Sequence, residues 1–279
     1  MIWLVYLIGF LALLVAALAG WRAVDGRADQ SAWKYLAGMG SGNGRTFDPA
    51  MVADLPEPAR RYFRFTIQPG TPLHTVVEID MMGELGLGTM AAPNYQSMQA
   101  RQILAPPQGL VWKVKTGAIS GSDGALPESS WTRFWLFGLF PVVRASGLDH
   151  RRSAFGRVAA EAAFWAPASL LPGDHVRWEP LDENVARAFV QYGAFEQAVD
   201  ITVDDRGAPS RVVIQRWSNA NSEKQFREQP FGGDLSDFRE FEGYRLPTRV
   251  EGGNHIGTPD YFPFFKAVVT GIRFLGNGS

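Results

Sequence analysis

The first 21 residues, Met1 to Trp21, contain no charged side chain, and residues 2–19 are almost entirely aliphatic or aromatic. An α-helix rises 1.5 Å per residue, so about 20 such residues cross the roughly 30 Å hydrocarbon core of a bilayer. Trp3 and Trp21 stand near the two ends, and tryptophan favours the two lipid–water interfaces. We therefore predict a membrane anchor over residues 1–21, with Trp3 and Trp21 as its interfacial residues.

A cleaved secretory signal is the alternative interpretation of this segment. Ala17-Leu18-Ala19 has the small-x-small pattern of a cleavage site. The apolar run is longer than the usual signal core of about 7–15 residues, and no Lys or Arg precedes it. A retained anchor is therefore favoured.

The rest of the chain has the composition of an ordinary globular protein. Hydrophobic residues make up 46% and charged residues 20% of the sequence. We expect a juxtamembrane segment with a glycine-rich linker over residues 22–47, flexible around Gly38 to Gly44, and one domain over residues 48–276. The net charge of −1 gives no strong field to attract nucleic acid, and the lack of cysteine excludes disulfides and thiol chemistry.

Alternating apolar and polar residues predict many strands after Leu73. The expected strands are residues 76–81, 95–104, 110–115, 186–192, 198–203, 211–217, 238–244, 248–252 and 267–274. Turns such as Pro106 to Gly109 and Asp204 to Gly207 join neighbouring strands. Many strands joined by short turns favour an antiparallel sheet over parallel β-α-β units.

Three stretches have helical character. Residues 49–65 begin with early prolines, and the alanine-rich residues 155–171 end at prolines. Residues 131–143 would form a helix that is apolar nearly all round and too short to cross a bilayer. We predict an α+β, mainly β protein: an N-terminal transmembrane helix, then a curved antiparallel sheet, an open half-barrel that encloses helices.

No catalytic or metal-binding constellation is evident, so we predict no catalytic residue, no metal and no cofactor. The four histidines lack ligand spacing. Glu161 stands four residues after Arg157, which favours a helical ion pair, although a buried Glu161 could act as an acid or base or contact a ligand head group. His150, next to Asp149 and Arg151, belongs either to a polar cluster or, as we prefer, to a solvated loop.

Several segments resemble an uncharacterised bacterial family of single-anchor membrane proteins. They are residues 55–63, 109–112, 157–172 with Trp178-Glu179, and 244–247, and the likeness covers about residues 48–275. The most specific piece is the Trp-x-Pro-x-x-Leu-Leu-Pro segment that starts at Trp165. The predicted curved sheet is also similar to the periplasmic lipoprotein carriers, whose half-barrels hold acyl chains. These likenesses imply a fold and assign no catalytic residues.

The nine Trp and nineteen Phe favour a concave, aromatic-lined site for an apolar ligand such as a lipid or acyl chain. The candidate ligand-binding residues are Trp112, Trp135, Phe137, Glu161, Trp165, Leu170 and Leu171. The alternative is an accessory subunit of a larger membrane complex, since Gly9, Ala12, Ala16 and Ala19 offer a small-residue face to other membrane helices. An enzyme is the third class, with Glu161 or His150 as the residue to test.

We expect a single-pass protein of the cytoplasmic (inner) membrane with its domain on the periplasmic side. The likeness to periplasmic carriers and the lone N-terminal anchor favour export. Arg22 and Arg27, directly after the anchor, favour the opposite orientation, but a large following domain weakens that counting rule. The expected partners are membrane lipids and, in the alternative function, other integral membrane subunits.

Overall fold

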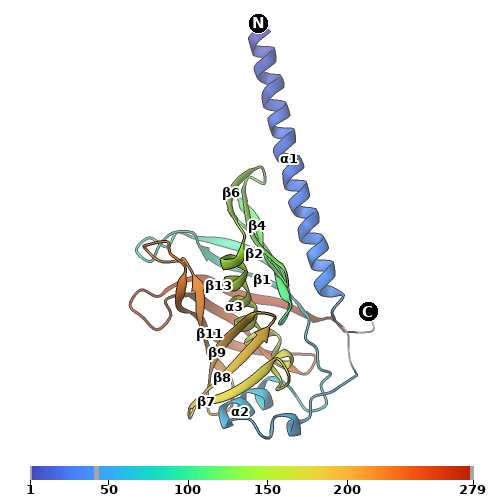
Figure 1. The fold of residues 1–279 in the computed structure, drawn as a ribbon, viewed down its shortest axis with the longest axis vertical. Helices are drawn as coiled ribbons and strands as arrows, with labels where there is room; N and C mark the ends of the chain where they lie inside the picture. Colours follow the sequence, from blue (N-terminus) through green and yellow to red (C-terminus); the bar gives the residue numbers. More distant parts are fainter. Residues whose placement is uncertain (1, 41–43, 277–279) are drawn as a thin grey trace.

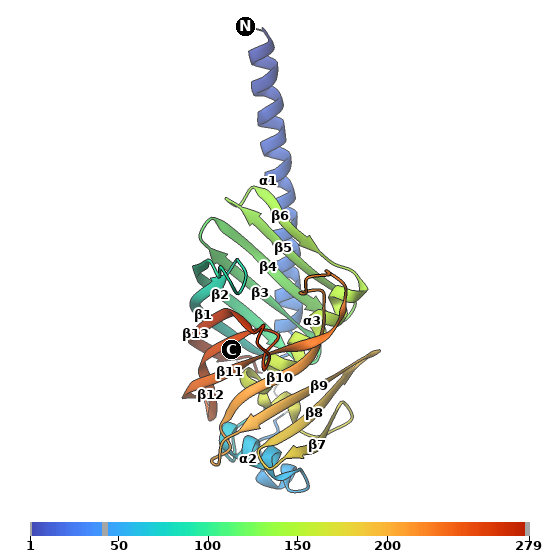
Figure 2. The same cartoon turned by 90° about the vertical axis from the view of Figure 1, so that its left-hand side faces the viewer.

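The computed structural model describes residues 2–40 and 44–276. Within them, the strands form one antiparallel sheet of thirteen strands that curves around a helix and stays open on one side (Figures 1 and 2). The first six strands are β1 (Val77–Gly86), β2 (Tyr95–Ala105), β3 (Gly109–Thr116), β4 (Ile119–Leu126), β5 (Ser129–Leu136) and β6 (Phe140–Ala145). The other seven are β7 (Val176–Asp182), β8 (Val185–Tyr192), β9 (Phe195–Val203), β10 (Pro209–Ser218), β11 (Arg227–Phe241), β12 (Tyr244–Asn254) and β13 (Phe262–Phe274). The mainly β, half-open architecture predicted from the sequence is confirmed.

The sheet consists of two meanders joined edge to edge. Its order is β6-β5-β4-β3-β2-β1-β13-β12-β11-β10-β9-β8-β7, so neighbours in the sheet are neighbours in the chain except at β1–β13. At that junction Val77 pairs with Phe274 and Met82 pairs with Val268. The helical elements are α1 (Ile2–Ala37), η1 (Pro49–Val52), α2 (Glu57–Thr66), α3 (Leu148–Trp165) and η2 (Pro167–Leu170).

Helix α3 lies on the concave face and fills the middle of the half-barrel, chiefly against β10 and β9 (Figure 2). Its alanines, including Ala159, Ala162 and Ala163, are fully buried. Small side chains let the helix backbone approach the sheet closely, which explains the alanine-rich sequence. The Tyr62 hydroxyl donates a hydrogen bond of 2.7 Å to the Ala163 carbonyl, which joins α2 to α3. The helix expected over residues 155–171 is present as α3, which starts earlier, at Leu148, and ends at Trp165, followed by the separate η2.

Helix α1 continues well past the predicted anchor. Its apolar N-terminal part projects from the domain with no buried share, whereas Asp25, Asp29, Ala32 and Leu36 are buried (Figure 1). These four residues recur every three or four positions, so they share one face of the helix. That face packs on the outer side of β2, β3 and β4. The expected flexible juxtamembrane segment is therefore helical as far as Ala37, and residues 41–43 of the expected linker lie outside the described residues.

The helix expected over residues 131–143 is wrong, because this stretch is the hairpin of β5 and β6. Trp131, Arg133 and Trp135 face α1, while Thr132 and Phe134 face the concave side. A strand covered on both faces lacks the usual apolar–polar alternation, so its sequence reads like an all-round apolar helix.

Two further expectations change in the structure. The single helix expected over residues 49–65 divides into η1 and α2. Pro56 stands directly before α2, and a proline has no backbone N–H with which to continue the hydrogen bonding of a preceding helix. His150 does not lie in a solvated loop. It belongs to the first turn of α3 and is partly buried against β5.

Candidate functional site

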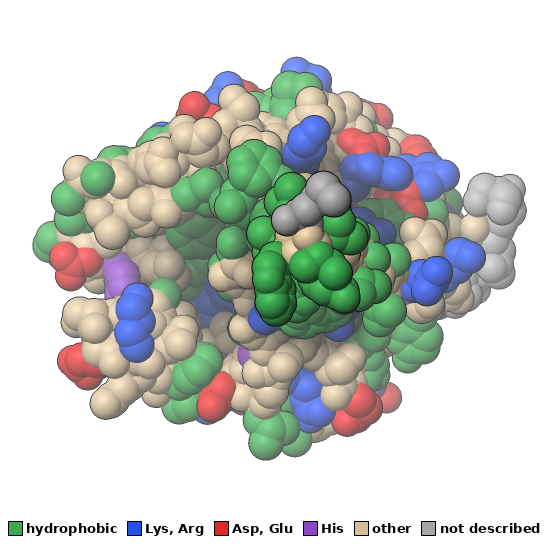
Figure 3. Space-filling view, turned by 90° about the horizontal axis from the view of Figure 1, so that it is seen from above, with side chains coloured by type: hydrophobic (Ala, Val, Ile, Leu, Met, Phe, Trp, Pro, Cys, Tyr) green, Lys and Arg blue, Asp and Glu red, His purple; other side chains and the backbone are tan. Residues whose placement is uncertain are grey.

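A cavity of about 260 Å³ lies between α3 and the concave face of the sheet. Its apolar wall includes Trp112, Phe134, Phe164, Trp165, Phe231 and Phe265. Seen along α1 from its N-terminal end, the domain is hollowed beside the helix, with hydrophobic side chains around the hollow and basic ones inside it (Figure 3). Aromatic walls with few polar groups are typical of sites for apolar ligands.

The polar part of the cavity is organised around Arg157 of α3. Its Nε donates to Oε1 of Glu161 at 2.5 Å, and its Nη1 donates to Oδ2 of Asp123 at 3.1 Å. Its Nη2 donates to Gln102 Oε1 at 3.2 Å, and the Gln102 amide donates to the other oxygen of Glu161. Burial disfavours the charge on Arg157, but the Glu161 and Asp123 carboxylates outweigh it and hold the pKa of the guanidinium above its usual value. The expected Arg157–Glu161 ion pair is present, and Glu161 also faces the sheet.

Arg216 of β10 is the second basic group of the cavity. Its Nε donates to the Ser153 carbonyl at 3.1 Å, and its guanidinium lies 4.6 Å from the centre of the Phe231 ring. Among the described residues, no carboxylate lies within 4.0 Å of Arg216. Burial and the nearby charge of Arg157 lower its pKa to about 10, so the group remains cationic at neutral pH. Arg216 is therefore a cation without a direct counter-ion in the described chain.

Two tryptophans of the cavity wall carry unpaired donors. The Nε1 atoms of Trp112 and Trp165 are buried and have no hydrogen-bond partner in the described part of the chain. Both residues line the cavity. A buried donor without an acceptor is unfavourable by about 1–3 kcal/mol. Neither indole nitrogen is exposed to the cavity, so Arg216 is the donor there that suits a ligand with hydrogen-bond acceptors.

His150 extends the polar cluster toward β5. Its ring nitrogens lie 2.7 Å from the Ser130 hydroxyl and 3.0 Å from the Thr132 hydroxyl. Thr132 donates in turn to Asp123 at 2.7 Å, which links His150 to the Arg157 cluster. Burial lowers the pKa of His150, and the Asp123 charge opposes this shift only in part. The imidazole is therefore neutral at pH 7 and holds two hydroxyl groups in place.

The structure brings together three of the seven predicted ligand-binding residues. Trp112, Glu161 and Trp165 line the cavity. Leu170 is fully buried, and its carbonyl accepts a hydrogen bond of 3.0 Å from Trp178 Nε1. Leu171 packs against the main core from the side. Both leucines thus support the end of α3, and neither lines the cavity.

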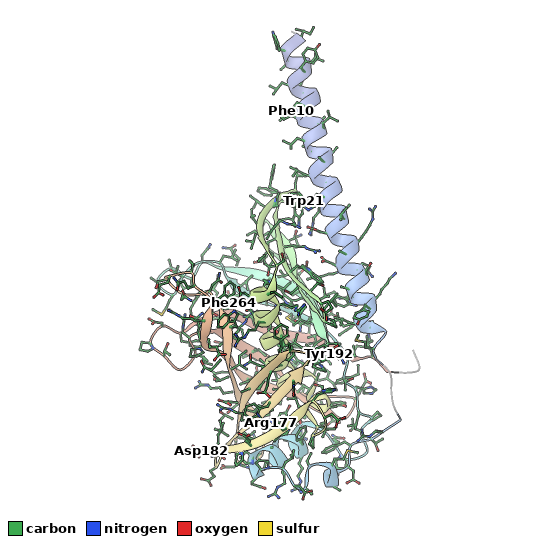
Figure 4. The ribbon with its side chains drawn as sticks, in the orientation of Figure 1. Phe10, Trp21, Arg177, Asp182, Tyr192 and Phe264 are labelled. Atoms are coloured by element: carbon green, nitrogen blue, oxygen red, sulfur yellow. The ribbon has the colours of Figure 1, made fainter. Side chains whose placement is uncertain are left out.

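The remaining predicted residues lie away from the cavity. Trp135 is fully buried and meets Trp21 edge to face, with ring centres 5.6 Å apart. Phe137 stands at the β5–β6 turn and is 75% exposed. Trp3 is exposed near the end of α1, whereas Trp21 lies where the helix meets the domain (Figure 4).

Three important residues of the site were not singled out from the sequence: Asp123 and Arg216, which line the cavity, and Gln102, which bonds to Arg157 and Glu161. One signal was present for Arg216. In β10, Val212 and Ile214 alternate inward as core residues, and Arg216 occupies the next inward position. A charged residue at the inner position of an otherwise apolar strand is a candidate functional group. Gln102 and Asp123 carry no comparable signal, because their strands were either polar or not recognised.

A second hollow, of about 650 Å³, lies on the outer face between α1 and strands β1 to β4. Its basic residues are Arg22, Arg101, Lys113 and Lys115. Arg101 already pairs with Asp80 at 2.8 Å, and Lys113 lies 5.4 Å from the centre of the Trp33 ring. Burial lowers the pKa of Lys113. This groove is more open and is lined by several charged side chains, so the cavity with its aromatic wall is the better candidate for an apolar ligand.

The chain belongs to the family of unknown function DUF6544, whose profile matches residues 45–267. The predicted membership of an uncharacterised family is thus confirmed. A comparison with curated proteins gave no match. Similar solved structures include a LolA superfamily protein from Nitrosomonas europaea, with a TM-score of 0.42 and 9% identity, covering 78% of this chain and 91% of that one. Another is a putative outer membrane lipoprotein-sorting protein domain from Vibrio parahaemolyticus, with a TM-score of 0.38 and 11% identity, covering 71% and 85%. TM-scores below 0.5 carry over nothing about what those proteins bind.

Proposed function

We propose that this member of the DUF6544 family is a membrane-anchored binding protein for an amphiphile with an apolar chain and an acidic head group. The observation that carries the proposal is the position of Arg216, a cation without a direct counter-ion at the edge of an aromatic-lined cavity. Such a site offers an apolar wall to a chain and a guanidinium to a carboxylate or phosphate. The Arg157 cluster would keep the polar end of the cavity in shape.

The size of the cavity limits the ligand. Sites for drug-sized molecules usually enclose about 300–1,000 Å³, and this cavity encloses about 260 Å³. We infer a single chain, or one chain of a larger lipid, as the bound part. A fatty acid or a lysophospholipid meets both the size and the charge requirement.

Residues 2–21 are the proposed membrane span. In the structure they form an uninterrupted apolar helix with no buried share, long enough to cross a bilayer. We propose the inner membrane as its location and the periplasm as the side of the domain. Protease treatment of intact spheroplasts tests this orientation: digestion of the domain supports it, and protection until lysis contradicts it.

The binding proposal is tested with the full chain in detergent micelles. A dansyl-labelled fatty acid is titrated into the protein, and unlabelled oleate is then used to displace it. We expect saturable binding with enhanced, blue-shifted dansyl emission, and native mass spectrometry should show one bound chain. The same label on a short-chain acid serves as the control for non-specific adsorption. Equal signals from the two probes would contradict the proposal.

The accessory-subunit alternative stays a prediction. It rests on the small-residue face formed by Gly9, Ala12, Ala16 and Ala19, which no observation in the structure tests. For the enzyme alternative, both oxygens of Glu161 are engaged by Arg157 and Gln102, and His150 is engaged by two hydroxyl groups. These contacts favour positioning roles for Glu161 and His150 within the binding site.

A further inference from the structure

The hairpin of β5 and β6 ends in an unusual tip. From Trp135 to Val143 the chain has no charged residue, whereas turns usually carry polar residues. Phe137 and Gly138 form the turn with positive φ angles of 51° and 69°. Phe137 is 75% exposed, and Phe140, Val142 and Val143 are each nearly half exposed. The tip therefore presents a cluster of large apolar side chains to its surroundings.

This tip lies beside the helix proposed to span the membrane. Figure 1 shows the hairpin pointing along α1 in the direction of its N-terminus. The Trp135–Trp21 contact fixes the hairpin against the helix, and Leu18 of α1 is partly covered. The tip thus stands at the level where the uncharged part of α1 begins.

On both α1 and the β5–β6 hairpin, charged residues are replaced by apolar residues at the same level along α1. On α1, Asp25 is followed toward the N-terminus by Arg22 and then by no further charge. On the hairpin, Arg144 bonds to Asp25 at 2.7 Å, and the residues beyond it toward the tip are uncharged. A shared boundary of this kind is expected where two elements meet one lipid–water interface.

We propose that the β5–β6 tip, residues 137–143, inserts into the bilayer interface next to α1 and gives the domain a second contact with lipid. This inference rests on the proposed membrane span. Strand β6 is an edge strand, and an exposed apolar edge invites aggregation unless something covers it. Lipid covers the side chains, while the free backbone groups of the edge keep the tip in the interface and out of the hydrocarbon core.

Two contacts also hold the domain in one orientation. The helix alone would allow the domain to tilt relative to the membrane plane. A second contact on one side of α1 limits the tilt. The hollow that Figure 3 shows beside α1, on the side of the aromatic-lined cavity, then faces the bilayer. In this position the cavity could exchange an amphiphile with the membrane.

The absence of cysteine from the sequence makes the test direct, because single cysteines can be labelled without a background. Phe137→Cys, Leu11→Cys and Leu181→Cys are each labelled with a nitrobenzoxadiazole fluorophore and reconstituted into phosphatidylcholine vesicles. Leu11 lies within the proposed span. Leu181, on β7 beside Asp182 at the far end of the domain, is an apolar control that is 46% exposed (Figure 4). Vesicles with lipids brominated near the glycerol or near the chain ends report the depth of each label.

We expect quenching at positions 11 and 137 and none at 181, with position 137 quenched mainly by the shallow bromines. Quenching at 11 without quenching at 137 overturns the tip insertion and leaves the span intact. Lack of quenching at 11 overturns the span, and with it the tip insertion. Blue-shifted but unquenched emission at 137 shows that protein, such as a second copy of the chain, covers the tip, and it also overturns the proposal.

Discussion

Asp25 and Arg144 form a two-pronged ion pair, in which the guanidinium donates to both carboxylate oxygens at 2.7 and 3.1 Å. Asp25 belongs to α1 and Arg144 to the edge strand β6, so the pair joins α1 to the sheet. Burial acts against the charge of Asp25, but Arg144 and Arg133 outweigh it and lower the pKa of the carboxyl. The charged pair thus contributes to the packing of α1 on the sheet.

Loss of this pair should weaken the attachment of α1. We expect Asp25→Asn to destabilise the protein, and the coupling with Arg144→Gln in a double-mutant cycle to be about 1–3 kcal/mol. Denaturant titrations in detergent measure both. The exposed pair Arg249–Asp237 is the control, with an expected coupling of about 0–1 kcal/mol. Equal coupling in the two pairs would contradict the structural role given to Asp25.

Replacement of Arg216 should weaken binding of acidic amphiphiles specifically. We expect Arg216→Gln to raise the Kd for a dansyl-labelled fatty acid by about 10- to 100-fold, the usual range for hydrogen bonds to a charged group. Binding of the corresponding fatty alcohol should change little, because it lacks the charge. Arg211→Gln is a matched control on the same strand, where the side chain is exposed and paired with Asp234. A parallel loss of acid and alcohol binding would show that Arg216 shapes the cavity without contacting the head group.

His150 should make the protein sensitive to mild acid. Its pKa in the fold is lowered, so the unfolded chain binds a proton more readily, near pH 6.5. The stability that depends on neutral His150 is complete above this value and is lost as the pH falls toward the lower pKa of the folded state. We expect the Tm of the wild type to fall more between pH 7 and pH 5 than that of His150→Gln. Parallel slopes for the two proteins would contradict this role.

Gly124 leaves space for the indole of Trp131. A Cβ at this position would lie 2.1 Å from the Trp131 ring, which is buried between the sheet and α1. We expect Gly124→Ala to destabilise the protein by about 1–3 kcal/mol through displacement of that ring. Gly173→Ala serves as the control, because nothing lies within 4 Å of its Cβ position. Equal unfolding free energies for the two variants would show that the sheet adapts without strain.

The sequence pattern was sufficient to predict strands in which one face is buried and the other is exposed to solvent. Strands such as β8 and β10 alternate clearly, so their pattern was sufficient. Strand β4, with the sequence ISGSDGAL, was missed because glycines stand where large rings from β5 need room. Its strand character comes from its neighbours in the sheet and is absent from its own apolar pattern.

The candidate site was likewise predicted only where the local sequence carried the information. Glu161 and Arg157 were found together because they lie four residues apart on one helix. Asp123 and Gln102 join them from β4 and β2, and this proximity depends on strand register, which local sequence does not encode. Trp135 was expected among the ligand-binding residues, whereas it packs against Trp21 of α1, and local sequence does not show that a distant helix covers this face of the strand.

The junction of β1 with β13 has a consequence for the order of folding. In the described part of the chain, this is the pairing that connects the N-terminal meander to the C-terminal one, and it joins residues nearly 200 positions apart. A ribosome that makes the chain from the N-terminus releases β13 after the other twelve strands of the described sheet. Until then β1 keeps an open edge, α3 has part of its covering surface missing, and the nascent half-barrel remains two separate sheets. Such long-range closure is slow, so the last strand acts as the completion step of the molecule, and a chain that ends before Phe262 would keep both edges open to the wrong partners.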